Sequence, residues 1–294
     1  MTPPSSTFFS ASPNWEWLII CYFFIGGLAG GCYFLAVLLD LFGRVGDRPL
    51  ARLGYLVAFP AVVVSGILLT LDLGQPLRFW HMLLQSNRIA LMFKPWSPMS
   101  IGSWALLAFG AFSFVSFLAA LEWRRFHVFR PPALLGIVVA ILGGALGFFV
   151  AGYTGILLAV TNRPIWADTN LLGLVFVVSA ASTSISLLIL LAYRRRGAIG
   201  TVHALGRFDV WVLVLELVTL VALVVSLGPV ATVWLSGWGA LLGVGVFLIG
   251  ILIPLALHAR PRTLGGLSLP TAAVLTLIGG FVLRVVIVMS AQAV

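Results

Sequence analysis

Long apolar stretches, separated by short polar segments, recur along the whole chain. Each stretch holds roughly twenty residues or more with few charges, the length that an α-helix needs to cross about 30 Å of hydrocarbon. We predict eight helices, at residues 15–40, 52–73, 100–121, 133–160, 171–192, 210–228, 239–258 and 270–291. A membrane β-barrel would instead show alternating segments of about 10 residues, and these are absent from the sequence.

The composition favours a membrane protein over a soluble one. Of the 294 residues, 61% are hydrophobic and 9% are charged, whereas a soluble domain carries about 25% charged residues. Because hydrocarbon offers the backbone no hydrogen-bond partner, long apolar runs must form helices. We therefore predict an all-α integral membrane protein, in which residues 1–294 form a single eight-helix transmembrane domain within the lipid bilayer.

The basic residues are distributed unevenly among the connections. The formal net charge is +9, but it is spread over short loops, so we expect no nucleic-acid binding. The odd-numbered connections hold twelve arginines and the even-numbered connections hold four basic residues. Because basic loops tend to remain in the cytoplasm, we predict that both termini lie on the outer (periplasmic) side of the inner, cytoplasmic membrane.

Polar side chains gather at the outer ends of three predicted helices. Glu16 opens the first helix and Asp72 closes the second, and the segment DLGQPLRFWHML that starts at Asp72 adds Arg78 and His81. Tyr153 lies about nine residues before Asn162, which places its ring roughly 13 Å below the outer helix end at 1.5 Å per residue. A tyrosine hydroxyl at that depth needs a hydrogen-bond partner.

Two interpretations of these residues are open. Glu16 suits the positive end of a helix dipole, and Tyr153 could bond to a backbone carbonyl, but Asp72 lies at the unfavourable end of its helix. Alternatively, the group lines a cavity for a quinone, which needs donors to its oxygens and groups that exchange protons. A neutral histidine or a partly desolvated acid can exchange protons near neutral pH.

Other charges lie deeper or at the inner side. Glu216 in the sixth predicted helix and Arg284 in the eighth are functional candidates because charges in hydrocarbon are unfavourable. With Asp40 near the inner end of the first helix, they could form a proton path, or Glu216 and Arg284 could pair with neighbours for structure. Asp209 is assigned to the edge of a cytoplasmic loop, without a special role.

Two sequence features bear on helix packing and on metal cofactors. The run GGLAGG from Gly26 to Gly31 repeats small residues four apart, as do Gly143 and Gly147, which predicts close helix packing. No cluster-binding cysteine spacing and no facing histidine pair deep in the helices are present, so we expect no iron–sulfur cluster, haem or other metal in this chain. The residues concerned are Cys21, Cys32, His81, His127, His203 and His258.

Five stretches, in order along the chain, resemble NrfD-like membrane subunits, the family that includes the polysulfide reductase membrane subunit. They are YFFIGGLAGGCYF, LDLGQPLRFWHML, SPMSIGSW, GYTGILLAVTNRPIW and GGFVLRVVIV. The resemblance implies an eight-helix, haem-free anchor that reacts with quinone near the outer face, with an acid matching Asp72 and a tyrosine matching Tyr153. It implies a departure at Glu16, where the polysulfide reductase membrane protein has histidine.

The resemblance also implies two partners on the outer face, a ferredoxin-like iron–sulfur subunit and a catalytic subunit, often a molybdopterin enzyme. We therefore expect a subunit that binds menaquinone or ubiquinone and performs the quinone half-reaction. In this hypothesis Tyr153 bonds a quinone oxygen, Asp72 and His81 move protons, Arg78 orients Asp72 or the loop, and Glu16 lines the pocket. The alternatives are a secondary transporter that uses Glu216 and Arg284, and a passive membrane anchor without quinone chemistry.

Overall fold

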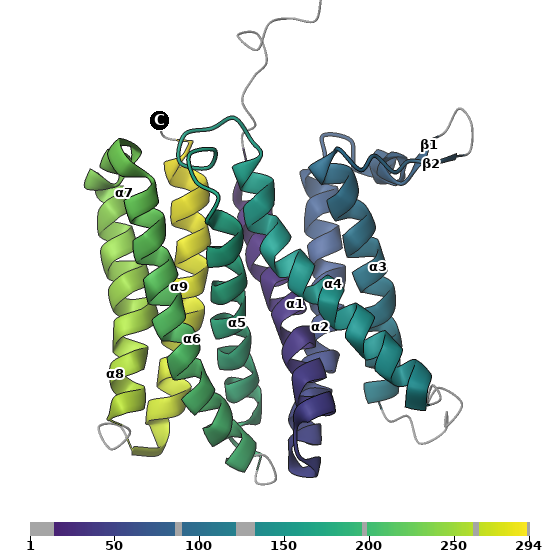
Figure 1. Ribbon diagram of the computed structural model, residues 1–294, viewed down its shortest axis with the longest axis vertical. Coiled ribbons are helices and arrows are strands. Elements are labelled where there is room, and N and C mark those ends of the chain that lie inside the picture. The colour runs from purple at the N-terminus through teal and green to yellow at the C-terminus, as the bar shows by residue number, and fades with distance from the viewer. Residues whose placement is uncertain (1–14, 86–89, 122–132, 196–198, 261–264, 293–294) are drawn as a thin grey trace, which may run out of the picture.

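The computed structural model describes residues 15–85, 90–121, 133–195, 199–260 and 265–292. Within this part of the chain, eight helices are long and apolar enough to cross a membrane. They stand side by side as one layered bundle, and the described ends of the chain lie at the same end of it (Figure 1). We call this the terminal end, and we call the opposite end, which carries the arginine-rich odd-numbered connections, the basic end.

The spanning elements follow the apolar runs of the sequence. They are α1 (Trp17–Phe42), α2 (Arg48–Asp72), α3 (Pro98–Ala120), α4 (Ala133–Ala159), α5 (Leu172–Ala192), α6 (Ile199–Ser226), a seventh span made of α7 (Gly237–Ala240), the π-helical η7 (Leu241–Leu252) and α8 (Ile253–Ala259), and α9 (Ser268–Ser290). The connections contain η2 (Val45–Asp47), η3 (Pro76–Met82), β1 (Leu84–Gln85), β2 (Ala90–Leu91), η6 (Gly228–Leu235) and η8 (Gly265–Leu267).

The predicted bounds agree closely for seven spans and are wrong for the start of the sixth. That helix begins at Ile199 rather than at residue 210, so Arg207 and Asp209 belong to α6 and not to a loop. The first turns of α6 contain several polar residues, and Thr201 and Asp209 among them are buried against other helices. Because His203 and Arg207 in the same turns are exposed, the segment as a whole has the polar composition of a loop.

Close packing at the glycines confirms the expectation drawn from GGLAGG. A Cβ atom added at Gly30 of α1 would collide with the carbonyl oxygen of Gly147 in α4, and one added at Gly31 would collide with Ser184 in α5. Helix α1 therefore packs tightly against both α4 and α5, and it also makes extensive contact with α2. Helix α4 packs against α5 as well, so α1 and α4 together join the two halves of the bundle, α1–α4 and α5–α9 (Figure 1).

Aromatic side chains join the two halves at the terminal end. The rings of Trp15 and Trp166 stack at 5.2 Å, and Trp166 donates its indole N–H to the carbonyl of Ile287 at 2.7 Å. The side chain of Gln292 bonds both the backbone N–H and the carbonyl of Trp15. These contacts attach the start of α1 to the end of α9 and fix the position of Glu16, the next residue along the chain.

Candidate functional site

Two carboxyl groups meet at the terminal end of the first half. Glu16 directly precedes α1 and makes no side-chain capping bond, although it lies at the positive end of the helix dipole. Asp72 is the last residue of α2, and its carboxyl group and that of Glu16 are close enough to interact electrostatically. Both side chains are exposed, so together they form an accessible acidic pair where α1 begins and α2 ends.

Tyr153 of α4 lies below this pair, in the interior. Its hydroxyl donates a hydrogen bond of 2.6 Å to the carbonyl of Pro98 at the start of α3, and the side chain is 6% exposed. The partner is thus a backbone carbonyl, as one of the two sequence interpretations proposed. The ring fills the space above Gly102, where an added Cβ would collide with the phenol carbons and oxygen, so only glycine leaves room for the tyrosine.

Two further hydroxyls at the same level were missed in the sequence. Tyr22 of α1 is buried, with 3% of its surface exposed. Ser65 of α2 is fully buried, and its hydroxyl has no hydrogen-bond partner among the described residues. Tyr22 and Ser65 both border Gly26 of α1.

These three side chains occupy one depth in the bundle. Tyr22 follows Glu16 by six residues, Ser65 precedes Asp72 by seven, and Tyr153 precedes the end of α4 by six, which at 1.5 Å per residue puts each about 10 Å from the terminal end. We call Tyr22, Ser65 and Tyr153 the hydroxyl layer. Ser65 had a sequence signal, because residues seven apart share a helix face and Asp72 was already a candidate.

Arg78 and His81 lie outside the bundle, in η3. The ring of His81 stacks on Trp80 with centroids 3.8 Å apart, and its Nδ1 lies 3.2 Å from the carbonyl oxygen of Arg78. These contacts are local to η3, while the hydroxyl layer lies deeper between the helices. The structure therefore brings Glu16 and Asp72 together at the rim, with Tyr153 beneath them and the two basic residues in the adjoining connection.

A second polar group is buried between α1, α5, α6 and α9. Arg284 of α9 is 1% exposed and donates to the Ser179 hydroxyl at 2.6 Å and to the Gly280 carbonyl at 2.7 Å. Glu216 of α6 accepts a bond of 2.6 Å from Ser182 and interacts electrostatically with Arg284. We call this group the Arg284–Glu216 network, and it confirms that both residues have neighbours with which to pair.

The Arg284 guanidinium also lies against the first half of the molecule. It is positioned over the rings of Phe24 in α1 and Phe176 in α5, at 5.8 Å and 5.2 Å from their centroids. An added Cβ at Gly27 of α1 would lie 3.5 Å from one of its terminal nitrogens. The arginine therefore lies at the junction where α1 meets α5 and α9.

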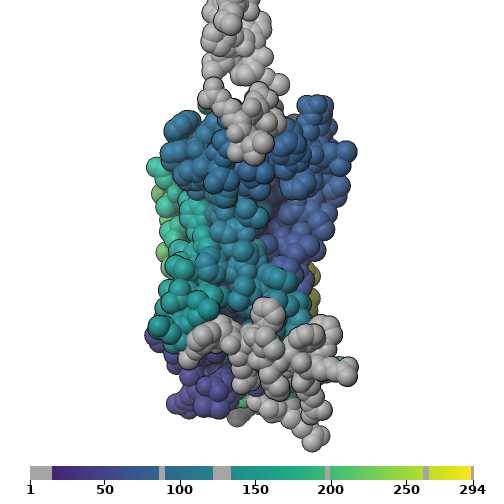
Figure 2. All heavy atoms as spheres, turned by 90° about the vertical axis from the view of Figure 1, so that its right-hand side faces the viewer, coloured from purple at the N-terminus to yellow at the C-terminus, as the bar shows by residue number. Residues whose placement is uncertain are grey.

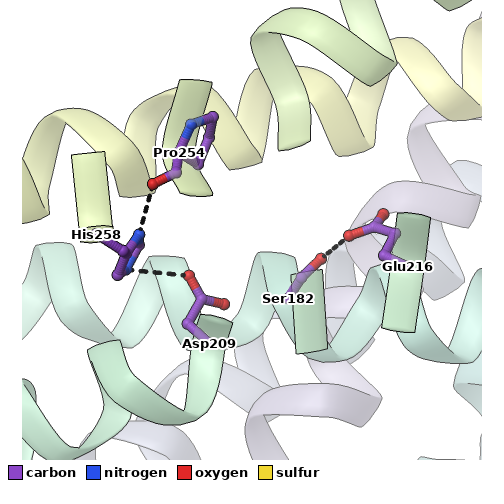
Figure 3. A network of polar contacts seen from close by, with 5 residues as sticks. All are labelled: Ser182, Asp209, Glu216, Pro254 and His258. Carbon is purple, nitrogen blue, oxygen red and sulfur yellow. Dashed lines mark hydrogen bonds and ion pairs between the residues drawn. The ribbon is translucent and has the colours of Figure 1, made fainter. Parts of the chain in front are cut away.

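Asp209 and His258 form a third buried pair, which corrects the assignment of Asp209 to a loop without a role. Asp209 is two helical turns before Glu216 on α6 and is fully buried, and its carboxylate lies 3.7 Å from Nε2 of His258 in α8 (Figure 3). His258 Nδ1 lies 2.7 Å from the carbonyl oxygen of Pro254. A carbonyl only accepts, so Nδ1 carries hydrogen, and the 3.7 Å separation between Nε2 and the Asp209 carboxylate is a close polar contact longer than a hydrogen bond.

Asp40 does not join these groups. It lies near the end of α1 at the basic end of the first half, where it lines a cavity with residues of α2, α3 and α4. The structure thus brings Glu216 and Arg284 together and places Asp40 among different helices.

Comparison with known proteins agrees with the helical pattern and the order of the motifs. The family model described as polysulphide reductase, NrfD, matches residues 5–294. The chain belongs to the NrfD family. This NrfD-family protein is 30% identical to a polypeptide of polysulfide reductase from Wolinella succinogenes, over 83% of this chain and 82% of that protein. It is 27% identical to the NrfD homolog of Haemophilus influenzae over 83% of each chain, and 26% identical to protein NrfD of Escherichia coli over 98% of each.

A shorter match concerns a fourth relative. A selenate reductase subunit from Mesobacillus selenatarsenatis is 27% identical over 32% of this chain and 20% of its own length. Family membership together with eight apolar helices identifies the chain as a multi-pass membrane protein of the NrfD family.

Proposed function

We propose that this protein is the quinone- or quinol-binding subunit of a membrane-bound oxidoreductase complex, exchanging electrons between menaquinone or ubiquinone and an iron–sulfur partner. The observation that carries the proposal is the gathering of Glu16 and Asp72 at the terminal end of one four-helix half, with the hydroxyl layer about 10 Å deeper in the same half. Relatives named as parts of polysulfide reductase and selenate reductase support a place in such a complex.

The residues present fit a quinone chemically. A quinone supplies two-electron redox chemistry that consumes or releases two protons, so its site needs hydrogen-bond donors and proton-exchanging groups. Ser65 carries a buried hydroxyl without a described partner, and Tyr153 carries a hydroxyl whose single hydrogen is donated to Pro98. Binding of a ligand oxygen by Tyr153 therefore requires that it exchange the Pro98 carbonyl for the ligand.

The acidic pair is suited to proton exchange with the outside. A carboxyl group can accept and release a proton, and Glu16 and Asp72 place two of them at the terminal end. Their exposure gives that proton a route to solvent, and His81 and Arg78 in η3 lie in the adjoining connection. We assign Asp72 and His81 to proton transfer, Glu16 to the pocket rim, and Arg78 to orienting Asp72 or the connection.

The topology supports placing the site on the periplasmic side. The arginine-rich basic end belongs in the cytoplasm by the charge rule for loops, so the terminal end faces outward in the inner membrane. Partners that deliver or receive electrons, a ferredoxin-like iron–sulfur subunit and a catalytic molybdopterin subunit, would then bind over the terminal end beside η3, β1 and β2.

The Arg284–Glu216 network and the Asp209–His258 pair suggest proton translocation in the second half. Glu216 and Asp209 are seven residues apart on α6, about 10 Å at 1.5 Å per residue, and their charges interact. The same buried charges are what a secondary transporter would use. Substrate uptake by liposomes that contain the protein without any iron–sulfur partner would favour the transporter, whereas a complex indifferent to quinone analogues would favour a passive anchor.

The proposal is tested by Asp72→Asn and Tyr153→Phe in the assembled complex. Loss of a proton-transfer group lowers turnover by about 100-fold or more, and loss of one hydrogen bond of about 1.5 kcal/mol lowers it by roughly tenfold. Quinol-dependent turnover is the readout, and co-purification of the partner subunits shows that assembly persists. Tyr193→Phe, at the basic end after α5, is the control, and unchanged turnover in both site variants would refute the site.

A further inference from the structure

A cavity of about 420 Å³ lies at the basic end of the first half, far from the hydroxyl layer. It is bounded by the end of α1, the first two turns of α2, the end of α3 and the start of α4. A ligand bound in this cavity would be separate from the proposed quinone site, which lies at the opposite end of the same four helices.

The polar wall of the cavity comes mainly from one face of α2. Arg48, Arg52 and Tyr55 line it, and their spacing of four and three residues places them on the same side of the helix. Arg52 donates from Nε to the carbonyl of Ala120 in the last turn of α3, which fixes its guanidinium over the cavity. The start of α2 adds the positive end of a helix dipole.

Tyr55 places a buried hydroxyl at the cavity, beside Asp40. The side chain is 9% exposed, and its ring packs edge-on against that of Tyr33 at 5.1 Å. The Asp40 carboxyl group is near enough to act on this hydroxyl both as a charge and as a hydrogen-bond acceptor, although the contact lacks the geometry of a full hydrogen bond. The hydroxyl can therefore donate either to Asp40 or to a ligand in the cavity, and its oxygen remains free to accept.

The opposite wall of the cavity is apolar and reaches the surface of the bundle. Val115 of α3 and Ile137 of α4 line the cavity and are also 37% and 43% exposed. Exposed apolar residues continue along both helices, among them Phe114, Leu134, Val138 and Ile141. The face that carries α3 is turned to the viewer in Figure 2, with the basic end below. The site therefore joins a charged recess to an apolar, lipid-level face, which is the shape of an amphiphile site.

We propose that this cavity binds the headgroup of a phospholipid that carries a primary amine, such as phosphatidylethanolamine, with an acyl chain against α3 and α4. Basic recesses between helices on the cytoplasmic side suit lipid phosphates, and Arg48, Arg52 and Tyr55 supply the donors. Asp40 would repel a purely anionic headgroup, but it can accept hydrogen bonds from an ammonium group. Because the cavity carries both arginines and an aspartate, we expect it to prefer a zwitterionic headgroup with N–H donors. Phosphatidylglycerol lacks the positive charge, and the quaternary amine of phosphatidylcholine lacks N–H donors.

Native mass spectrometry of the full-length protein in detergent measures this directly, with phosphatidylethanolamine, phosphatidylglycerol and phosphatidylcholine added separately. One arginine near a lipid phosphate contributes about 1 kcal/mol, or roughly fivefold in affinity. Arg48→Gln should therefore weaken binding of all three lipids about fivefold. Arg44→Gln is the matched control, because Arg44 is an exposed arginine of the same connection outside the cavity wall.

Asp40→Asn separates amine recognition from phosphate recognition. The variant should lose the preference for phosphatidylethanolamine over phosphatidylglycerol, a change of roughly two- to fivefold for an exposed ion pair. Free phosphoethanolamine and inorganic phosphate are the headgroup-only arms and should compete poorly, because they lack the acyl tail. Equal effects of Arg44→Gln and Arg48→Gln, an unchanged lipid preference in Asp40→Asn, or full displacement by inorganic phosphate would each overturn the proposal.

Discussion

Replacing Gly102 with alanine should disable the candidate site without unfolding the protein. In the native structure the Tyr153 ring lies where the alanine Cβ would be, with its nearest atoms closer than 3.0 Å, whereas ordinary contact begins at 3.4 Å. The ring must therefore move by more than 0.4 Å. A displacement of about 1 Å would stretch its 2.6 Å bond to the Pro98 carbonyl to about 3.6 Å, which is no longer a hydrogen bond.

Three free-energy terms decide the stability of this variant. An alanine in a helix is favoured over glycine by about 0.8–1.0 kcal/mol, the lost hydrogen bond is unfavourable by about 0.5–1.5 kcal/mol, and displacing a buried ring is unfavourable by about 1–3 kcal/mol. The net loss of stability of Gly102→Ala should therefore be about 1–3 kcal/mol, which leaves the protein folded. In the proposed site, the displaced ring also moves its hydroxyl away from the position in which it would meet a ligand oxygen.

Quinol-dependent turnover of the assembled complex is the assay. Gly102→Ala should lower turnover by about tenfold, as Tyr153→Phe does, since each removes one hydrogen bond, and the double variant should be no worse than either single one. Gly110→Ala, two turns further along α3, is the control, because its Cβ would meet Val62 at an ordinary 3.5 Å. Full turnover in Gly102→Ala, or an equal loss in Gly110→Ala, would refute this account of the tyrosine.

Two further substitutions test the packing that holds the site. Gly30→Ala should destabilise the protein by about 1–3 kcal/mol through overpacking, because the added Cβ meets the backbone of Gly147. Gly66→Ala in α2 is the control and should be neutral or stabilising, because Gly66 has open space around it. Denaturation in mixed micelles compares the stability of the two variants. Trp166→Phe should lower stability in the same assay by about 1–3 kcal/mol, since it removes the buried bond to the Ile287 carbonyl.

The helices could be predicted from the sequence because a long apolar run is a strong signal of a membrane-spanning helix. A run of twenty apolar residues has few alternatives to a spanning helix, and seven of eight predicted spans agree with the structure within a few residues. The sixth span shows where this reasoning fails. Its first turns hold His203 and Arg207, which are exposed, and Asp209, which is buried, and hydropathy cannot distinguish a polar loop from helical turns that carry such residues.

The candidate site was predictable only as a set of residues at one end. Asp72 and Tyr153 were found because an acid at a helix C-terminus and a deep tyrosine are unusual. Tyr22 and Ser65 were not found, because a tyrosine or serine in an apolar run carries no charge signal. Nor does sequence spacing reveal that α8 lies beside α6, which is what brings His258 to Asp209. Which residues of two distant helices meet depends on how each helix is rotated about its own axis. A helix that is apolar on every face does not specify that rotation.

The Arg284–Glu216 network offers a sharper test of what buried charges do in this fold. Removing Arg284 alone takes the nearby positive charge away from Glu216, which is 3% exposed. It also removes the hydrogen bonds from Arg284 to Ser179 and Gly280, and a hydrogen bond of a charged group contributes about 1.5–3 kcal/mol. Arg284→Gln should therefore be strongly destabilising in mixed-micelle denaturation, and Glu216→Gln should lose less, since the Ser182 hydroxyl can still donate to the amide oxygen. The double variant removes both charges and should regain much of the stability lost in Arg284→Gln, giving a coupling energy of about 1 kcal/mol or more, within the range of about 0.5–3 kcal/mol for residues in one network. If instead the stability losses of the two single variants simply add, Arg284 and Glu216 are not an ion pair. Glu216 is then neutral in the folded protein and carries its own proton.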